Sequence, residues 1–238
     1  MTNYITGDII ISQKPRRKKM AKRVYSLILD DDVIECVDRL AYENRTNRSN
    51  MINQLLAEHF SFVTPEKRMR EIFDRIEELL TKKNTLRLDA SPSESMISLR
   101  SALVYKYNPT VKYSVELYKN ALPLLGELRV SMRTQNSTLL LYLMQFYRAW
   151  AAIENSYSHT DCRIEDGKFC RKLTLRQSTV NEISAISSNT VGQLITDYIT
   201  TLDNAMKAYF YNIDTPEIAV AEMEKIYARY LYDSELVI

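Results

Sequence analysis

The segment from residue 22 to residue 60 limits what this chain can fold into more than any other part of the sequence. Arg23 to Asp30 combines alternation with β-branched and aromatic side chains, which is typical of a strand. The acidic run Asp30–Asp32 then favours a helix start, because carboxylates stabilise the positive end of a helix. Apolar residues at helical spacing predict a first helix from about Asp31 to Glu43.

A second helix follows the polar break 44–47. Asn47 is a good N-cap for it. Its apolar face consists of Met51, Ile52, Leu55, Leu56 and Phe60. A single strand leaves its backbone donors and acceptors unpaired, and about 40 residues bury too little surface to be stable alone. We therefore expect the strand to pair with its copy in a second chain.

In order and spacing, Lys22 to Phe60 resembles the ribbon-helix-helix (Arc/MetJ/CopG-type) family of DNA-binding proteins. The resemblance implies an intertwined homodimer whose two-stranded ribbon enters the DNA major groove, with the N-termini of the second helices at flanking phosphates. It places Tyr25, Leu27 and Leu29 under the helices. The family pattern assigns base reading to Val24, Ser26 and Ile28, and a phosphate clamp to Asn47, Arg48 and Ser49.

The sequence departs from the family pattern at three positions. Val24 and Ile28 are apolar, so they can touch thymine methyl groups but supply no hydrogen bonds to bases. The alternative is that these two residues pack against another part of the chain or a protein partner. Arg45 stands in the turn where the family often has glycine, so a residue with a Cβ must adopt the dihedral angles of that turn.

A basic arm precedes the predicted strand. Residues 1–23 carry seven basic side chains against one acidic, whereas residues 24–238 carry 25 basic and 29 acidic. Such an arm is typical of a tail that binds a polyanion. The basic side chains nearest the ribbon, which we expect to contact DNA phosphates, are Arg16, Arg17, Lys18, Lys19, Lys22 and Arg23.

The remaining chain predicts an α+β fold that is mostly helical overall, with a small antiparallel sheet. An amphipathic helix from Pro65 to about Lys83 must pack on its own chain or on a partner, and residues 84–94 predict a linker. The later elements are strands over Leu99–Tyr107, Val111–Tyr118, Leu128–Arg133 and Lys168–Leu175, and helices over Thr138–Asn155, Val180–Tyr211 and Pro216–Tyr232. The expected organisation is an arm (1–21), a ribbon-helix-helix domain (22–62), a helix and linker (63–94) and a C-terminal α+β domain (95–238).

The sequence offers little for catalysis or metal binding. His59 and His159 lie far apart, and the chain has neither a phosphate-binding loop motif nor G-x-S-x-G, so we expect no enzyme and no cofactor. His159, Cys162 and Cys170 form H-x-x-C-x7-C without an evident fourth ligand, and we predict no metal site. Unpaired cysteines and the absence of a membrane-spanning pattern favour a cytoplasmic, nucleoid-associated protein.

Together these features predict a homodimeric, sequence-specific DNA-binding protein, most simply a transcriptional repressor. Two alternatives stay open: an architectural or segregation protein of the nucleoid, and an antitoxin-like adaptor that binds a protein partner through residues 95–238. The C-terminal domain could also sense a small-molecule effector. Its aromatic stripe at helical spacing predicts a packed core, however, and consists of Tyr142, Phe146, Tyr147 and Trp150.

Replacing Arg16, Arg17, Lys18 and Lys19 with alanine should weaken DNA binding for every DNA sequence tested. Each lost phosphate contact lowers the slope of log affinity against log salt by about 0.9, so four contacts lower it by roughly 3.6. Fluorescence anisotropy titrations of duplex DNA over a salt series measure this slope. An unchanged slope would show that the arm is not the electrostatic anchor.

Overall fold

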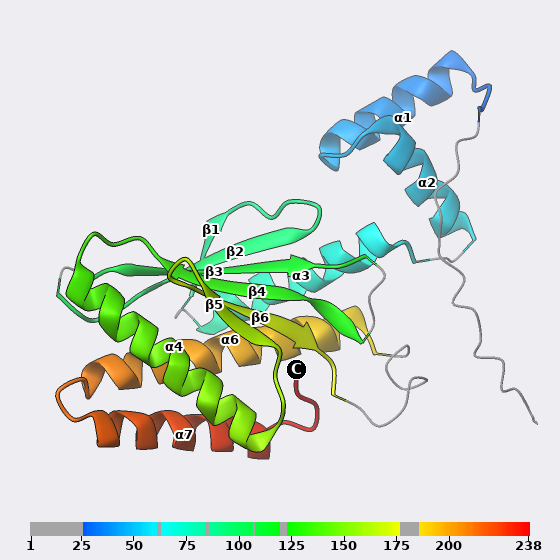
Figure 1. Cartoon of the computed structure of the whole chain (residues 1–238). Coiled ribbons are helices and arrows are strands. Elements are labelled where there is room, and N and C mark those ends of the chain that lie inside the picture. Colours follow the sequence, from blue (N-terminus) through cyan, green and yellow to red (C-terminus); the bar gives the residue numbers. More distant parts are fainter. Residues whose placement is uncertain (1–25, 61–62, 84–85, 107, 120–122, 177–185) are drawn as a thin grey trace, which may run out of the picture.

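The computed structural model describes residues 26–60, 63–83, 86–106, 108–119, 123–176 and 186–238. Figure 1 shows the helices and strands in chain order. The helices are α1 (Asp31–Glu43), α2 (Arg48–His59), α3 (Pro65–Lys83), α4 (Ser137–Tyr157), α6 (Ser188–Tyr211) and α7 (Pro216–Asp233). The strands are β1 (Arg87–Ala90), β2 (Met96–Ala102), β3 (Thr110–Leu117), β4 (Leu124–Met132), β5 (Cys162–Glu165) and β6 (Lys168–Thr174).

All six strands form one antiparallel sheet in the order β1-β2-β3-β4-β6-β5. Neighbours in the sheet are also neighbours in sequence except where β4 meets β6, because α4 and β5 intervene in the chain. The turn between β2 and β3 contains Asn108 at φ 43°, a left-handed conformation that asparagine tolerates better than most residues.

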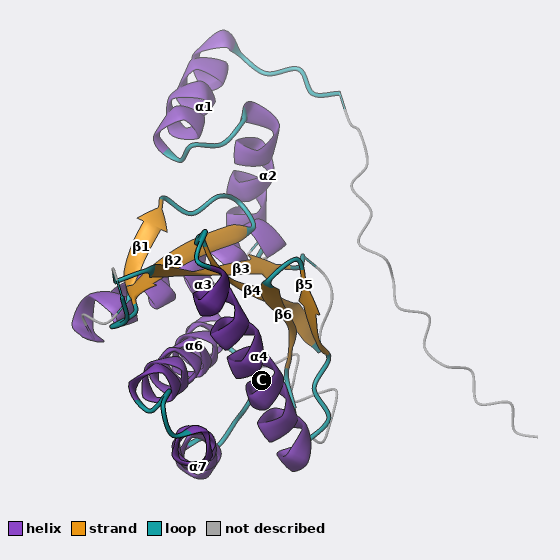
Figure 2. Ribbon diagram, turned by 60° about the vertical axis from the view of Figure 1, so that its left-hand side comes forward, coloured by secondary structure: helices purple, strands orange, loops and turns teal. Residues whose placement is uncertain are grey.

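Side chains alternate between the two faces of this sheet. The inner face carries the buried side chains, among them Leu99, Tyr113 and Leu128. Figure 2 shows α4, α6 and α7 gathered on one side of the sheet, with α1 and α2 on the other side. Because helices cover only the inner face, the opposite face is open and polar, which is usual for an antiparallel sheet.

Helix α3 belongs to the same core as the sheet. Its apolar residues Ile72, Phe73 and Ile76 are buried in the main hydrophobic cluster, and it packs along α6. The two helices approach closely at Gly192, where a Cβ would lie only 2.9 Å from the Arg75 Cβ. The apolar stripe of this helix is thus buried within its own chain.

A charged pair is buried where α4, α6 and β6 meet. Arg171 and Glu154 are 1% and 0% exposed, and the Arg171 Nε lies 2.9 Å from the Glu154 Oε1. Arg171 also donates to the backbone oxygen of Ile238 at 2.7 Å and lies over the ring of Tyr198. Tyr198 in turn donates to Glu154 at 2.9 Å and accepts from Trp150. This network joins three elements and the last residues of the chain.

The structure confirms much of the predicted element pattern. Helix α1 spans Asp31–Glu43 as predicted, although Asp30 makes no side-chain capping bond. Helix α3 spans Pro65–Lys83, and the predicted hairpin is formed by β2 and β3. Its first strand is shifted, because β2 spans Met96–Ala102 and not the predicted Leu99–Tyr107. The fold is α+β with a large helical share. None of the described helices is long and apolar enough to cross a membrane.

Three expectations about the C-terminal region need correction or lie beyond the description. The linker predicted over 84–94 is wrong for Arg87–Ala90, which pairs with β2 as β1. The sheet is larger than expected, and β5 was not predicted because four residues with two charges give a weak strand pattern. For the helix predicted over Val180–Tyr211, residues 177–185 lie outside the described residues and α6 is described from Ser188.

Replacing Glu154 with leucine should destabilise the protein by about 3–5 kcal/mol, because Arg171 would keep a buried charge without its carboxylate. The double variant Glu154→Leu, Arg171→Met should recover much of this loss, since it removes both charges. Urea denaturation measures the free energy of unfolding, with Glu222→Leu as a control because Glu222 forms an exposed pair with Lys225. Equal losses for Glu154→Leu and Glu222→Leu would contradict a structural role for the buried pair.

Candidate nucleic-acid interface

Helices α1 and α2 pack on each other around a very small core. Only Val37, Ala41 and Met51 are buried in this cluster, with Leu40 and Ile52 packed against it. The main core of the protein, in contrast, takes residues from α3, α4, α6, α7 and the sheet. The α1–α2 pair therefore has little burial of its own to stabilise it.

The turn between α1 and α2 ends the first helix in a Schellman motif. The Thr46 N–H donates to the Ala41 carbonyl at 2.9 Å, and the Arg45 N–H donates to the Tyr42 carbonyl at 3.1 Å. Arg45 has φ 50°, the left-handed conformation that this position requires. Glycine is the usual residue there, so Arg45 carries a conformational cost that its Cβ imposes.

The start of α2 is fixed by two of the three predicted clamp residues. The Asn47 side chain accepts from the Asn50 N–H at 2.9 Å, which is an N-cap bond. Arg48 makes a two-point contact with Asp38 of α1, with the Nε donating to Oδ1 at 2.7 Å and the Nη2 to Oδ2. The Arg48 guanidinium holds the pKa of Asp38 below its usual value, chiefly through this hydrogen bonding. Ser49 is exposed.

Two contacts connect this helix pair to α3. The Arg70 guanidinium donates to the Asn44 side-chain oxygen at 3.2 Å, at the turn between α1 and α2. Lys67 donates to Glu58 of α2 at 2.9 Å, and this bonding raises the pKa of Lys67. Both contacts are exposed, so each contributes little stability.

Large apolar side chains of the N-terminal unit remain exposed in the single chain. Ile28 is fully exposed, Leu27 is 59% exposed and Phe60 is 73% exposed. Besides Ile28 and Tyr42, six large apolar side chains of this region are exposed, and we call these six the apolar surface: Leu27, Val33, Leu55, Leu56, Phe60 and Val63. So many apolar groups on a unit with so small a core are typical of a surface that binds another protein chain.

The structure places only part of the predicted DNA-binding set. Ser26 and Ile28 are exposed, and Leu29 between Ile28 and α1 is partly buried. Ser26–Asp30 has no strand pairing within the described single chain, so the strand predicted over Arg23–Asp30 stays a prediction. The remaining residues of the set lie outside the described residues: Arg16, Arg17, Lys18, Lys19, Lys22, Arg23 and Val24.

Sequence reasoning assigned Arg48 to the phosphate clamp but missed the contacts that orient the helix pair. Asp38 and Arg48 are ten positions apart on different helices, and neither belongs to an apolar pattern. The Asn44–Arg70 contact likewise joins elements separated by α2. The opposite charges of Asp38 and Arg48 in a helical hairpin were the one available indication of the first contact.

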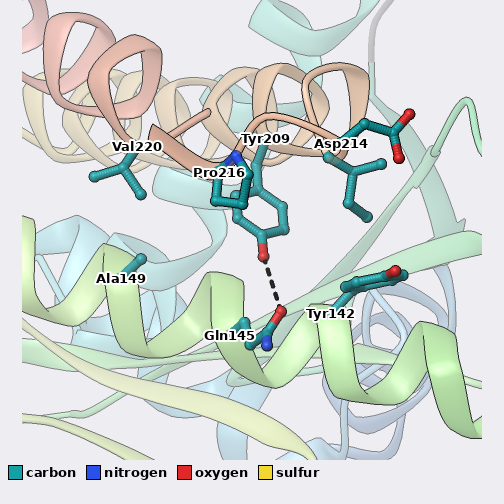
Figure 3. A pocket seen from close by; sticks show the side chains of 8 residues that line it. Tyr142, Gln145, Ala149, Tyr209, Asp214, Pro216 and Val220 are labelled. Atoms are coloured by element: carbon teal, nitrogen blue, oxygen red, sulfur yellow. Dashed lines mark hydrogen bonds between the residues drawn. The ribbon is translucent and has the colours of Figure 1, made fainter. Parts of the chain in front are cut away.

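A groove of about 530 Å³ lies on the other side of the molecule, between α4 and the turn from α6 to α7 (Figure 3). Tyr209 donates to Gln145 across it at 3.4 Å, and Asp214 is the one charged residue among those that line it. The predicted core role of the aromatic stripe is confirmed for Phe146, Tyr147 and Trp150, which are fully buried. Tyr142, the fourth member of the stripe, lines the groove instead.

The cysteines of the H-x-x-C-x7-C segment point to opposite faces of the sheet. Cys162 pairs with Arg171 and Cys170 pairs with Arg163, so the two thiols are on alternate faces of β5 and β6. Burial raises the pKa of both thiols. In the described parts of the chain, no three His, Cys, Asp or Glu side chains cluster in a way that could hold a metal ion.

Replacing Arg45 with glycine should stabilise the helix pair by about 1 kcal/mol, because glycine adopts a positive φ without a Cβ clash. Arg45→Ala is the control, since alanine loses the side chain but keeps the Cβ. Hydrogen exchange of the α1 and α2 amides reports this local stability, and the Gly variant should slow it roughly fivefold. Faster exchange in the glycine variant than in the alanine variant would contradict the left-handed turn.

Comparisons with known proteins identify no relative of this chain. No protein-family model matches the chain, and no curated protein or solved structure is significantly similar to it. What the protein does is therefore inferred from the geometry of its residues.

Proposed function

We propose that the protein binds duplex DNA as a homodimer assembled through residues 22–60. The observation that carries this proposal is the apolar surface of the α1–α2 unit, which a single chain leaves exposed. Burying one exposed valine, leucine or phenylalanine side chain completely stabilises an assembly by about 1.5–3 kcal/mol. Six such side chains in each chain supply enough apolar area for a stable dimer.

A second copy would also provide hydrogen-bond partners for the backbone groups of the residues before α1. Two antiparallel segments over Arg23–Asp30 would satisfy each other's N–H and C=O groups, with Leu27 and Leu29 turned to the helices. Leu29 is already partly buried, whereas its neighbour Ile28 is fully exposed. Leu27, on the same face of the proposed strand as Leu29, is 59% exposed, so a second copy is needed to cover this face.

The DNA contacts in this proposal come from three places. Val24, Ser26 and Ile28 face the major groove, and the basic arm follows phosphates. The start of α2 offers its first backbone N–H groups and the Ser49 hydroxyl to a phosphate, in a position that Asn47 and the Arg48–Asp38 pair keep fixed. Asn47 and Arg48 thus act mainly by orienting this helix end.

The biological role that fits best is transcriptional repression, with a nucleoid-architectural role as the second candidate. The apolar residues Val24 and Ile28 and the basic arm favour the second role, because both give binding with limited base recognition. Genome-wide occupancy separates the two roles. A few sharp sites indicate a repressor, and broad or clustered occupancy indicates an architectural protein. Residues 95–238 are proposed to be non-catalytic and to bind an effector or a protein partner.

Adjacent substitutions at Leu27 and Ile28 test the proposal sharply. Leu27→Glu should convert the dimer to a monomer, because the carboxylate would be buried between ribbon and helices. Ile28→Glu should remain dimeric and lose DNA affinity, because its charge would face the DNA phosphates. Analytical ultracentrifugation measures the assembly state, and fluorescence anisotropy of a labelled duplex measures DNA binding.

The control is Tyr232→Glu, which adds the same charge at a 91% exposed position of α7. This variant should keep both the dimer and the DNA affinity of the parent protein. A monomeric parent protein, or equal effects of the substitutions at Leu27 and Ile28 on assembly, would overturn the proposed ribbon.

A further inference from the structure

The open face of the sheet is a second charged surface, separate from the N-terminal unit. Seven basic side chains from the described strands lie on it against four acidic ones, a net charge of +3. The basic residues are Arg87, Arg100, Lys112, Arg129, Arg163, Lys168 and Lys172. The acidic residues are Asp89, Glu116, Glu127 and Glu165. We call this surface the basic sheet face.

The strand register orders these charges into rows across the sheet. Arg87 pairs with Arg100, Arg100 with Lys112, and Lys112 with Ser131 on β4. Phe169 on β6 pairs with Val130 on β4. Lys168, one residue before Phe169, therefore lies beside Ser131 and extends the row to β6. With strands about 4.8 Å apart, this row spans roughly 19 Å. The row thus carries four cations against one carboxylate, Asp89, which lies 4.0 Å from Arg100 and 2.9 Å from Lys112.

In the next row, two arginine side chains contact a buried carboxylate. Arg129 and Arg163 lie on either side of Cys170, which pairs with both. Glu127 beneath them is 1% exposed and accepts from Lys172 at 2.6 Å, from Arg129 at 2.8 Å and from Arg163 at 3.3 Å. Burial acts to raise the pKa of Glu127, but these bonds outweigh it and hold the pKa below its usual value. The carboxylate stays ionised and fixes three cations.

The charge of the basic sheet face is opposite to that of the remaining body. Outside this face, residues 24–238 hold 18 basic and 25 acidic side chains, a net charge of −7. Residues 24–60 contribute −4 of this total, with 3 basic and 7 acidic side chains, and the rest of the body outside the face carries −3. The basic excess of residues 24–238 is therefore concentrated on the sheet face. That segregation complements a polyanion.

The face lacks what other polyanion-binding or protein-binding surfaces need. The six described strands place no aromatic side chain on it, and Tyr118, which follows β3, is held by Lys172 through its hydroxyl at 3.1 Å and its ring. One tyrosine ring is a small stacking platform for single-stranded bases. Its large apolar side chains are Met96 and the partly buried Leu124, which pairs with Thr174, and these are too few to insert into a lipid surface or to drive a dimer. Charges with small side chains such as Ser98, Ser114 and Cys170 between them suit a phosphate backbone.

We propose that the basic sheet face binds the phosphate backbone of duplex DNA, as a site additional to the N-terminal unit. The face lies on the same side of the sheet as α1 and α2, opposite to α4, α6 and α7 (Figures 1 and 2). The contact is independent of base sequence and adds affinity that depends on salt.

The test is a triple variant, Arg87→Gln, Arg100→Gln, Lys168→Gln, which leaves the Glu127 cluster intact. Binding of the full chain to a 40-bp duplex should weaken roughly tenfold, and the salt slope should fall by about 2.7, or 0.9 for each lost contact. The matched control, Arg148→Gln, Lys225→Gln, Arg229→Gln, removes the same charge from exposed positions of α4 and α7. It should change affinity less than twofold. Circular dichroism checks that both variants fold.

A gain-of-charge variant tests the same surface without removing any basic group. Glu116→Gln with Glu165→Gln raises the net charge of the face from +3 to +5 and should tighten DNA binding. Both experiments are repeated with Arg16, Arg17, Lys18 and Lys19 replaced by glutamine. The loss in the triple variant and the gain in the double variant should persist in this background, because the face acts without the arm.

The outcomes separate this proposal from that of the N-terminal dimer. If the face variants bind DNA like the parent protein while the arm variant binds weakly, the sheet face is not a DNA site and the N-terminal proposal stands. Equal losses of DNA affinity in the triple variant and in its matched control would mean that only the total charge matters. This result would overturn the proposed site. A triple variant that changes the assembly state but not DNA binding would assign the face to a second protein copy and also overturn it.

Discussion

Alternation along six antiparallel strands divides the sheet into an apolar face and a charged face, and the rest of the molecule is arranged around that division. The apolar face must be covered, and α3, α4, α6 and α7 share one continuous core with it. Tyrosine suits this contact because its ring is buried while its hydroxyl finds a partner, as where Tyr113 of β3 donates to Asp203 of α6 at 2.9 Å. The charged face has no such requirement, so it remains available for binding.

The N-terminal helix pair depends on a different source of stability. Its core of three residues cannot offset the entropy of ordering about 30 residues, and its two contacts with α3 are exposed polar pairs. A second copy would supply the missing burial, which makes assembly and folding of this unit a single event in the proposed dimer. The main body needs no such partner, because α3 completes its core from within the chain.

Local patterns predicted most helices because their ends are set locally. Thr64 caps α3 by accepting from the Lys67 N–H, and Asn47 caps α2 in the same way, so short polar motifs located both starts. The sheet was harder to predict, since β1 and β5 are four residues long and gain their pairing from strands elsewhere in the chain. For the candidate site, the pattern located α1 and α2 but gave no indication of the Arg48–Asp38 pair. Such a contact depends on how the two helices cross.

Charge segregation connects the two proposed DNA surfaces. Seven of the eight charged side chains in residues 1–23 are basic, the sheet face is basic, and the remaining body is acidic. A dimer would present two arms and two sheet faces to the duplex. Phosphate contacts of this kind orient a protein on the duplex without reading its sequence. The bases would then be read only by the short ribbon, whose apolar positions Val24 and Ile28 can favour thymine methyl groups but cannot supply a hydrogen-bonding code.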